Sequence, residues 1–279
     1  MMGKANEFDA ITHKAPGLIL PPELSEMLGG YSCVQITVGC SSAGVYRYDK
    51  AGSSLYLKIA RADGEARRER ELLYWLDGKL PVPEVKYWHE QDGLSYLLMT
   101  EVHGRMACDC PEDRVAVPVG NTVRLLADGL LMLQAVDTAG CPADNRLDTK
   151  LAGALCNIEN GLVDMAEWNE DNPFASPMEL YRWLDANRPP EDACFTHGDY
   201  CLPNVFISGT AVTGFIDLGR GGVADKWQDI ALCVRSLRYN LRDMPQEEKD
   251  GYVDLLFSRL GTAPDWEKIN YYILLDELF

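Results

Sequence analysis

The sequence predicts an α+β protein, with an antiparallel N-terminal sheet that carries one helix and a mainly helical C-terminal part. Alternating apolar residues, broken by Gly-containing turns, predict successive strands of hairpins at 31–38, 45–48 and 54–60. Beyond residue 104 the apolar residues recur at helical spacing instead, first over 119–136 and then over 147–162. We therefore expect two lobes, formed by residues 1–101 and residues 102–279.

The other N-terminal elements are two helices and two strands. Pro21 and Pro22 begin a short helix, because proline is tolerated in the first helical turn. Residues 64–76 form a second helix, in which Leu and Trp side chains share one side. Two further strands, 85–88 and 95–101, flank a turn with Asp-Gly.

Capping residues and periodicity define the remaining helices of the C-terminal part. Ser176 and Glu179 form a capping box with Pro177 at the first helical position, which predicts that a helix starts there. Three more helices are expected at 225–242, 246–260 and 265–278.

Composition favours a globular protein of the cytoplasm. With 47% hydrophobic residues, the 279-residue chain can bury a sizeable core. No run approaches the roughly 20 apolar residues that span a bilayer, and the polar N-terminus lacks the apolar stretch of a signal peptide. Nine cysteines, an odd number, and four scattered histidines predict reduced thiols rather than a disulfide framework or a soft-ligand metal cage.

Residues 196–231 concentrate oxygen-bearing side chains on turns beside short strands. Asp199 is followed five residues later by Asn204, and Asp217 follows an apolar run at 212–216. In phosphoryl transfer one carboxylate orients a hydroxyl nucleophile, while an amide and a second carboxylate hold the magnesium that neutralises the phosphates. An isolated Asp or Asn in a loop is usually a turn former, but the whole set at this spacing predicts phosphoryl transfer.

The charge of the chain bears on its partners. Its 43 acidic and 26 basic residues give a net charge of -17, which repels nucleic acid and anionic membranes and attracts cations. We expect no nucleic acid and no membrane as partners. Acidity can serve solubility alone, but together with a phosphoryl-transfer site it favours a polycationic acceptor. The oligomeric state is left open between a monomer and a weak dimer.

The same stretch resembles the aminoglycoside phosphotransferases, in particular the 3'-phosphotransferase branch. The signature of that family is similar to HGDxxxxN followed by IDxGRxGxADxxxDIA, and residues 272–279, YILLDELF, look like the C-terminus of the branch. The resemblance implies a two-lobed protein-kinase-like fold, ATP and Mg²⁺ as cofactors, an aminoglycoside acceptor and antibiotic resistance as the biological role. Leu202 is a departure, because some relatives carry an acid there, so substrate contacts can differ.

For the N-terminal lobe the resemblance implies nucleotide binding. Lys58, in the third strand, would reach the α- and β-phosphates with Glu69 as its partner, although a strand Lys on its own usually faces solvent. The loop 39–44 would cover the phosphates through Ser41; without the Lys-Ser/Thr of a Walker A motif it also fits an ordinary hairpin turn. The adenine would stack on an aromatic ring and contact the segment that joins the lobes, through Tyr56, Met99, Glu101 and Val102.

For the C-terminal lobe the resemblance implies catalysis. Asp199 would position the acceptor hydroxyl and accept its proton, while Asn204 and Asp217 would hold Mg²⁺. His197 would brace the loop through hydrogen bonds, because the carboxylate two residues on is the better base. Asp225 and Asp229 are similar to an Asp pair that braces a helix against the catalytic loop in the family.

Acidic residues at two places would bind the ammonium groups of the acceptor. The first place is the loop 164–172, which by composition alone is a polar surface loop and which has Ala166 and Asn169 where the family has acids. The second is the C-terminus, which by position alone is a segment prone to fraying. With the arginine near the metal loop, the substrate-binding residues are then Glu167, Glu170, Asp171, Arg220, Glu277 and the carboxylate of Phe279.

Two other classes of function stay open. One is a kinase of the same fold for another small-molecule hydroxyl, such as choline, a sugar or a macrolide, against which the acidic loop and the C-terminal acids argue. The other is a nucleotide-binding pseudokinase, against which the retention of both lobes' motif residues argues. Protein-kinase activity is disfavoured because no A-P-E segment follows Asp217.

Overall fold

The computed structural model describes residues 12–14, 18–37, 43–108, 119–165, 168 and 173–279. The chain divides into two compact units. The first consists of Met1–His103 and Gly214–Gly219, and the second of Gly104–Thr213 and Arg220–Phe279. Within the described ranges, no helix is both long and apolar enough to cross a membrane.

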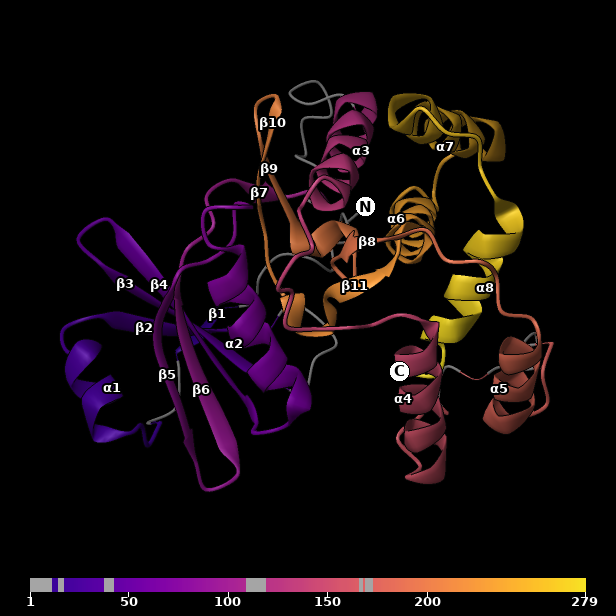
Figure 1. The fold of residues 1–279 in the computed structure, drawn as a ribbon. Coiled ribbons are helices and arrows are strands. Elements are labelled where there is room, and N and C mark those ends of the chain that lie inside the picture. The colour runs from indigo at the N-terminus through magenta and orange to yellow at the C-terminus, as the bar shows by residue number, and fades with distance from the viewer. Residues whose placement is uncertain (1–11, 15–17, 38–42, 109–118, 166–167, 169–172) are drawn as a thin grey trace, which may run out of the picture. The chain divides into compact units, whose positions relative to one another are not determined.

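The first unit is built on a six-stranded antiparallel sheet (Figure 1). The strand order is β1-β2-β3-β4-β6-β5, so successive hairpins lie side by side and only β5 and β6 exchange places. A strand at the edge, β1, was not predicted from the weakly patterned N-terminal residues. The strands are β1 (Thr12–Lys14), β2 (Ser32–Ile36), β3 (Gly44–Lys50), β4 (Ser53–Arg61), β5 (Val85–Gln91) and β6 (Leu94–Thr100).

The two faces of this sheet carry different side chains, because successive residues of a strand point to opposite faces. One face packs with the short helix α1 (Pro22–Met27) into an apolar core that contains Leu24, Leu57 and Leu98. The other face carries Lys58 and, paired across β4 and β6, Tyr56 and Met99. The sheet thus presents a lysine on the face that is not used for this core.

Helix α2 (Gly64–Leu76) begins and ends where its sequence predicts. The carboxylate of Asp63 accepts hydrogen bonds from the backbone amides of Glu65 and Ala66, both at 3.0 Å, and so caps the helix. Its buried apolar side chains include Leu72 and Leu76. Glu69 is buried on the same helix, which places a carboxylate inside the first unit.

The second unit is mainly helical, with short strands between the helices (Figure 1). Ser176 caps α5 as expected, but the Glu179 carboxylate accepts from the amide of Ala175 rather than from that of Ser176. The helices are α3 (Val119–Gln134), α4 (Leu147–Glu159), α5 (Pro177–Ala186), α6 (Lys226–Asn240), α7 (Gln246–Leu260) and α8 (Trp266–Asp276). The strands are β7 (Arg105–Met106), β8 (Ala193–Thr196), β9 (Val205–Ser208), β10 (Ala211–Phe215) and β11 (Gly222–Asp225).

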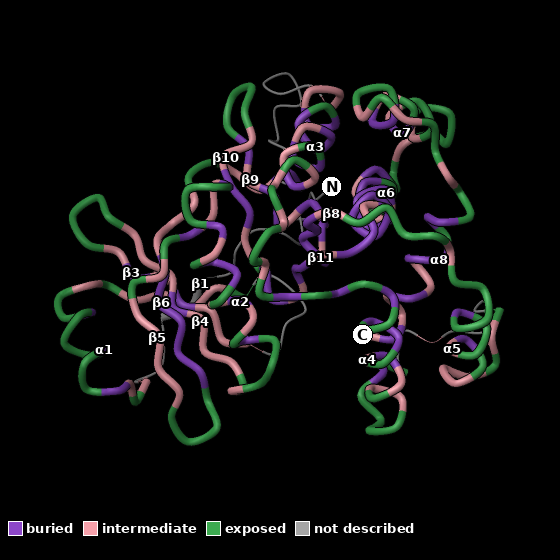
Figure 2. The backbone as a smooth tube through the Cα atoms, in the orientation of Figure 1, coloured by how far each residue is buried: buried purple, intermediate pink, exposed green. Residues whose placement is uncertain are grey.

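Helix α6 forms the centre of the second unit. It is buried along most of its length (Figure 2), and a run of its residues from Ile230 to Val234 is almost inaccessible to solvent. The ring of Trp227 stacks on that of Phe257 in α7, with ring centroids 6.3 Å apart. A helix buried on nearly all sides makes a rigid base for side chains that point from it toward neighbouring loops.

The predicted fold class is confirmed, and the helices and strands that were predicted are present with shifts at their ends. The helix predicted over 147–162 ends at Glu159, and the one predicted over 265–278 ends at Asp276. Such shifts are ordinary, because the last turn of a helix is defined by capping contacts rather than by periodicity.

Candidate active site

A lysine with two acidic partners lies in the first unit. The Nζ atom of Lys58 in β4 is 2.9 Å from Oε2 of Glu69 in α2, and it also forms an ion pair with Asp217. Glu69 is only 4% exposed. Of the three acids in this helix, Glu69 is therefore the one that reaches Lys58, as expected.

Lys58 and its acidic partners shift each other's pKa values, because opposite charges lie close together. Burial lowers the pKa of Lys58, but attraction by Glu69 and Asp217 more than offsets it, so that the pKa lies above its ordinary value. Burial raises the pKa of Glu69, and the nearby ammonium group opposes that rise. Lys58 is consequently a permanent cation, held in place by an almost fully buried carboxylate.

The segment that carries Asp217 belongs to the first unit. A side chain at Gly214 would bring its Cβ within 2.3 Å of a Val102 methyl carbon, so only glycine fits there. The amide of Phe215 donates to the carbonyl of Pro81 at 3.0 Å. Asp217 itself has a left-handed backbone with φ 64°. A non-glycine residue in this conformation is uncommon and is often found at functional sites.

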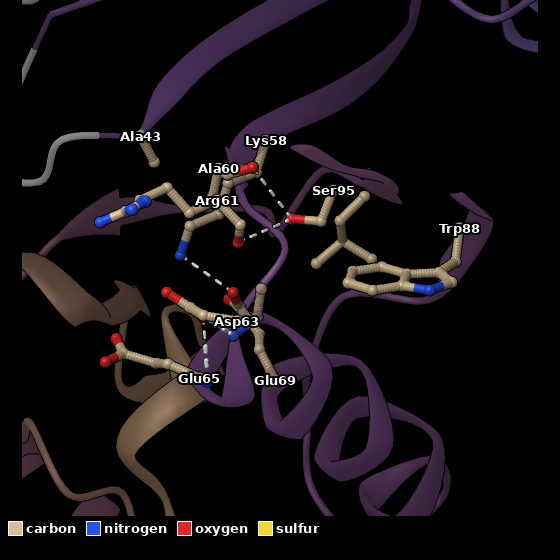
Figure 3. Close-up of a pocket in the computed structure, with 11 residues that line it drawn as sticks. Ala43, Lys58, Ala60, Arg61, Asp63, Glu65, Glu69, Trp88 and Ser95 are labelled. Carbon is tan, nitrogen blue, oxygen red and sulfur yellow. Dashed lines mark hydrogen bonds and ion pairs between the residues drawn. The ribbon is translucent and has the colours of Figure 1, made fainter. Parts of the chain in front are cut away.

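A pocket opens beside Lys58 and Glu69, between β4, β6 and α2 (Figure 3). At one end Ser95 donates to the carbonyl groups of Ala60 and Arg61, each at 3.4 Å. The carboxylates of Asp63 and Glu65 line it as well. The pocket thus combines both signs of charge around the lysine.

Ser41, predicted to contact the phosphates, lies outside the described residues. The other predicted nucleotide-binding residues lie in the first unit. Tyr56 stands directly opposite Met99 in the β4–β6 ladder, so both side chains are on the Lys58 face. Glu101 forms a loose ion pair with Arg47, at 3.8 Å. Val102 contacts Gly214, as described above.

In the second unit Asp199 and Asn204 are tied together. The Nδ2 atom of Asn204 donates both to the carbonyl oxygen and to Oδ2 of Asp199, each at 3.0 Å. The buried His197 accepts the amide of Asp199 on its Nδ1 atom at 3.3 Å. Because the amide nitrogen of Asn204 is engaged, its oxygen is the atom that it can offer to a cation.

A buried carboxylate from α6 holds the backbone of this loop. Oδ2 of Asp229 accepts from the amide of His197 at 2.6 Å, and Oδ1 accepts from the amide of Gly198 at 2.9 Å. Burial raises the pKa of Asp229, while His197 and the two amides act to lower it. Gly198 has φ 82°, and a Cβ there would lie 1.8 Å from the carbonyl oxygen of Arg220. The loop that carries Asp199 is therefore fixed on two sides.

The two aspartates at the start of α6 have different partners, unlike our expectation: Asp225 ends β11 and caps α6, and Asp229 lies within the helix. Asp229 braces the loop that carries Asp199, whereas Asp225 caps α6 through the amide of Trp227. The other oxygen of Asp225 accepts from Lys268 at 2.9 Å and from the hydroxyl of Tyr272 at 3.0 Å, both in α8. Its carboxylate is fully buried, so it bonds to the donors that surround it, and these lie in α8.

The acidic end of α8 is bound by arginines. Asp276 forms ion pairs with Arg235 and, at 3.6 Å, with Arg220. Arg235 also lies 3.8 Å from Glu277. Burial lowers the pKa of Arg235, but Asp276 and Glu277 together hold it above the ordinary value, with a smaller contribution from Asp199. Arg220 and Glu277, both predicted to bind substrate, are thus connected through this cluster.

Phe279, another predicted substrate-binding residue, packs on α4 near Lys150. The three acids of the predicted acceptor loop, Glu167, Glu170 and Asp171, lie outside the described residues. One supporting residue escaped sequence reasoning: Asn145 is buried and donates to the carbonyls of Arg220 and Gly221, both at 2.7 Å. No motif marks it, because a single Asn in a loop is an ordinary turn residue.

In the part of the chain that the structure describes, no group of three or more His, Cys, Asp or Glu side chains could hold a metal ion. The oxygen donors of Asn204 and Asp217 are nevertheless of the type that Mg²⁺ prefers, and this ion usually keeps several waters and binds through few protein ligands. Each of these two side chains, taken by itself, is therefore of a chemical type that suits Mg²⁺.

These features define a class of protein. A lysine held by a buried glutamate, an aspartate in a strained turn after a strand, and an Asp–Asn catalytic loop are the working parts of kinase-type phosphotransferases. The chain belongs to the phosphotransferase enzyme family, whose sequence profile matches residues 32–272.

Individual relatives make the likeness more specific. The chain is 43% identical to an aminoglycoside 3'-phosphotransferase of Enterococcus faecalis over 93% of its own length and 98% of that protein. Its fold is similar to the crystal structure of an aminoglycoside-3'-phosphotransferase of type VIII, with a TM-score of 0.76, 32% identity, and coverage of 88% of this chain and 94% of the other. An aminoglycoside phosphotransferase of Streptomyces rimosus, solved with ADP and streptomycin, also gives a TM-score of 0.76, at 26% identity over 91% of this chain and 95% of that one.

Proposed function

We propose that this protein transfers the γ-phosphoryl group of ATP to a hydroxyl of an aminoglycoside antibiotic, namely the 3'-hydroxyl, and thereby confers resistance. The tied Asp199–Asn204 loop is the observation that carries the chemistry, because it holds a carboxylate and a side-chain amide together in one fixed turn. The near full-length likeness to aminoglycoside 3'-phosphotransferases supports the choice of acceptor.

Asp199 acts on the acceptor. Its carboxylate receives a hydrogen bond from the hydroxyl, orients the oxygen toward phosphorus and takes up the proton as the new P–O bond forms and the bond from the γ-phosphorus to the departing ADP breaks. Because the transition state of phosphoryl transfer is loose, the attacking oxygen does not need to be strongly basic beforehand. Orientation of the hydroxyl is therefore the larger contribution of this residue.

The first unit binds the nucleotide. Lys58, braced by Glu69, is a fixed cation for the α- and β-phosphates. Tyr56, Met99, Glu101 and Val102 form the adenine end, and Ser41 belongs to the loop that covers the phosphates. When bound, Mg²⁺ neutralises phosphate charge, and the residues that would hold it are Asn204 and Asp217.

The second unit binds the cationic acceptor. Glu277 offers negative charge for ammonium groups, together with Glu167, Glu170 and Asp171, and Phe279 is a further contact of the acceptor. Arg220, paired with Asp276, keeps the local charge from becoming excessively negative. The chain's net charge of -17 adds long-range attraction for a polycation.

A coupled ADP-release assay tests this function. The enzyme is given ATP, magnesium and one acceptor at a time: kanamycin A, which has a 3'-hydroxyl; tobramycin, which lacks it; and streptomycin, the ligand of the Streptomyces rimosus protein. The Asp199→Ala variant is run beside each, with nucleotide binding as a check that it folds.

We expect turnover with kanamycin A alone, abolished in Asp199→Ala. Equal turnover with tobramycin would place the reaction at another hydroxyl, and turnover with streptomycin alone would place it on another acceptor subclass. Nucleotide binding without turnover on any of the three would contradict the proposal and favour a different acceptor or a non-catalytic protein.

A further inference from the structure

The last two residues of the sequence lie against one face of α4. The C-terminal end runs beside this helix (Figure 1), and the Nδ2 atom of Asn157 donates to the carbonyl of Leu278 at 2.9 Å. The ammonium group of Lys150 lies 4.7 Å from the centroid of the Phe279 ring, in cation–π geometry. Leu278 is fully buried. Polar and aromatic contacts thus hold both residues on the helix.

Gly153 completes this face. Residues 150, 153 and 157 are spaced by three and four positions, so they follow one another along a single side of α4. A Cβ at Gly153 would lie 3.4 and 3.5 Å from two carbons of the Phe279 ring. A methyl group would just touch the ring, whereas any longer side chain would occupy its place. Glycine is a poor residue for a helix interior, and here it leaves room for an aromatic ring.

The face also connects to the catalytic loop through charge. Lys150 is a buried residue of α4. Burial raises the pKa of Asp229, and Lys150 is one of the groups that act to lower it. Asp229 in turn holds the amides of His197 and Gly198. Among the groups that act to lower the pKa of Asp229, Lys150 contributes least, after His197 and the two amides.

We propose that Lys150, Gly153 and Asn157 form a positioning surface that fixes residues 277–279 and so sets the affinity for the aminoglycoside. This inference rests on the proposed function, in which Glu277 and Phe279 contact the acceptor. The amide of Phe279 donates to the carbonyl of Asp276 at 3.1 Å, so the segment continues the end of α8 as a turn. Docking on α4 at Leu278 and Phe279 therefore also restrains Glu277.

Two substitutions test the surface, each with a different physical effect. Gly153→Leu places a branched side chain where the Phe279 ring lies, and Asn157→Leu removes the donor to Leu278 while keeping a similar volume. Ala152→Leu is the matched control, because Ala152 is an exposed residue of the same helix. Gly153→Ala is a second control, since its methyl group reaches only ordinary contact distance.

Two readouts separate docking from its consequence. Amide hydrogen exchange of the peptide 271–279 reports docking without any assay of function. Steady-state kinetics report the KM for kanamycin A and the KM for ATP. For Gly153→Leu and Asn157→Leu we expect faster exchange and an acceptor KM raised about tenfold, the factor expected from losing one well-made contact, with the KM for ATP unchanged. Both control variants should behave as the wild type.

Unchanged exchange in both test variants would overturn the docking. Faster exchange with an unchanged acceptor KM would overturn the role in acceptor binding, and a parallel rise in the KM for ATP would show a general structural defect instead. If the wild type does not phosphorylate any aminoglycoside, both the proposed function and the role of this surface in acceptor binding are wrong. The exchange data would still decide whether the surface docks the C-terminal residues.

Discussion

Replacing Gly198 by alanine should damage the catalytic loop more than any ordinary Gly→Ala change. Two effects add. Gly198 has φ 82°, and a left-handed backbone costs an alanine roughly 1–2 kcal/mol. The new Cβ would also lie 1.8 Å from the carbonyl oxygen of Arg220, so that this carbonyl must move by more than an ångström.

That movement has a definite cost. The carbonyl of Arg220 accepts a hydrogen bond from the buried Asn145 at 2.7 Å. Losing such a bond and leaving a buried polar group unsatisfied costs about 1–3 kcal/mol. With the backbone contribution, we expect Gly198→Ala to lower the free energy of unfolding by roughly 2–5 kcal/mol. Displacement of the adjacent Asp199 should lower kcat by about a hundredfold.

Gly209→Ala provides the matched control. Gly209 has φ 58° and nothing within 4 Å of its would-be Cβ, so it shares the backbone cost without the clash. Urea denaturation followed by circular dichroism gives both unfolding free energies, and steady-state kinetics give kcat. If the two variants lose the same stability, or if Gly198→Ala keeps full kcat, then the close approach of Arg220 does not constrain the loop and the reasoning is wrong.

Three further predictions concern charged groups. Lys58→Met should destabilise the protein by about 3–5 kcal/mol near pH 8, because the buried Glu69 loses its counter-ion. Burial raises the folded-state pKa of Glu69 above its unfolded value, so the folded state loses stability as pH rises. Thermal melts of the variant should therefore show a smaller loss of stability near pH 5 than near pH 8. Adding Glu69→Leu to that variant should recover part of the loss. Asp229→Asn leaves one of two backbone amides facing a donor, which should cost roughly 2–4 kcal/mol and reduce kcat, as melts and kinetics would show. A hydrogen bond from Arg67 lowers the pKa of Glu90. This pair therefore stabilises the protein at pH values above the ordinary glutamate pKa of 4.5, and the stabilisation is lost as pH falls. In Arg67→Gln, NMR titration should find that the pKa of Glu90 has risen toward its ordinary value.

Periodicity explains why most of the fold could be predicted. Alternation around Lys58 defined β4, and the spacing of Leu72, Leu73 and Leu76 defined α2, because burial of one face leaves a repeat in the sequence. The strands β1, β7, β8, β9 and β11 were missed, since two to four residues are too few to show a period. Their pairing depends on partners that are distant along the chain.

The candidate site was predictable where chemistry limits the choice of residue. The positions of Asp199, Asn204 and Asp217 follow from oxygen donors at a diagnostic spacing. Supporting contacts were not predictable in the same way: the bond from Asn145 to Arg220 and the burial of Asp225 against α8 depend on tertiary packing. A sequence shows that such polar residues exist, but only the fold shows which donors they meet.

The inclusion of Gly214–Gly219 in the first unit limits how this protein can be recombined. The two units are not consecutive segments of the chain. A chimaera of two relatives joined near residue 103 would therefore take most of the first unit from one parent and Asp217 from the other. Val102 from one parent would then meet Gly214 from the other, at a contact with no room for a side chain. Chimaeras of relatives should therefore be viable mainly when residues 81–102 and 214–219 come from the same parent. In gene shuffling, functional variants should carry these two segments from the same parent, although more than a hundred residues separate the segments in the sequence.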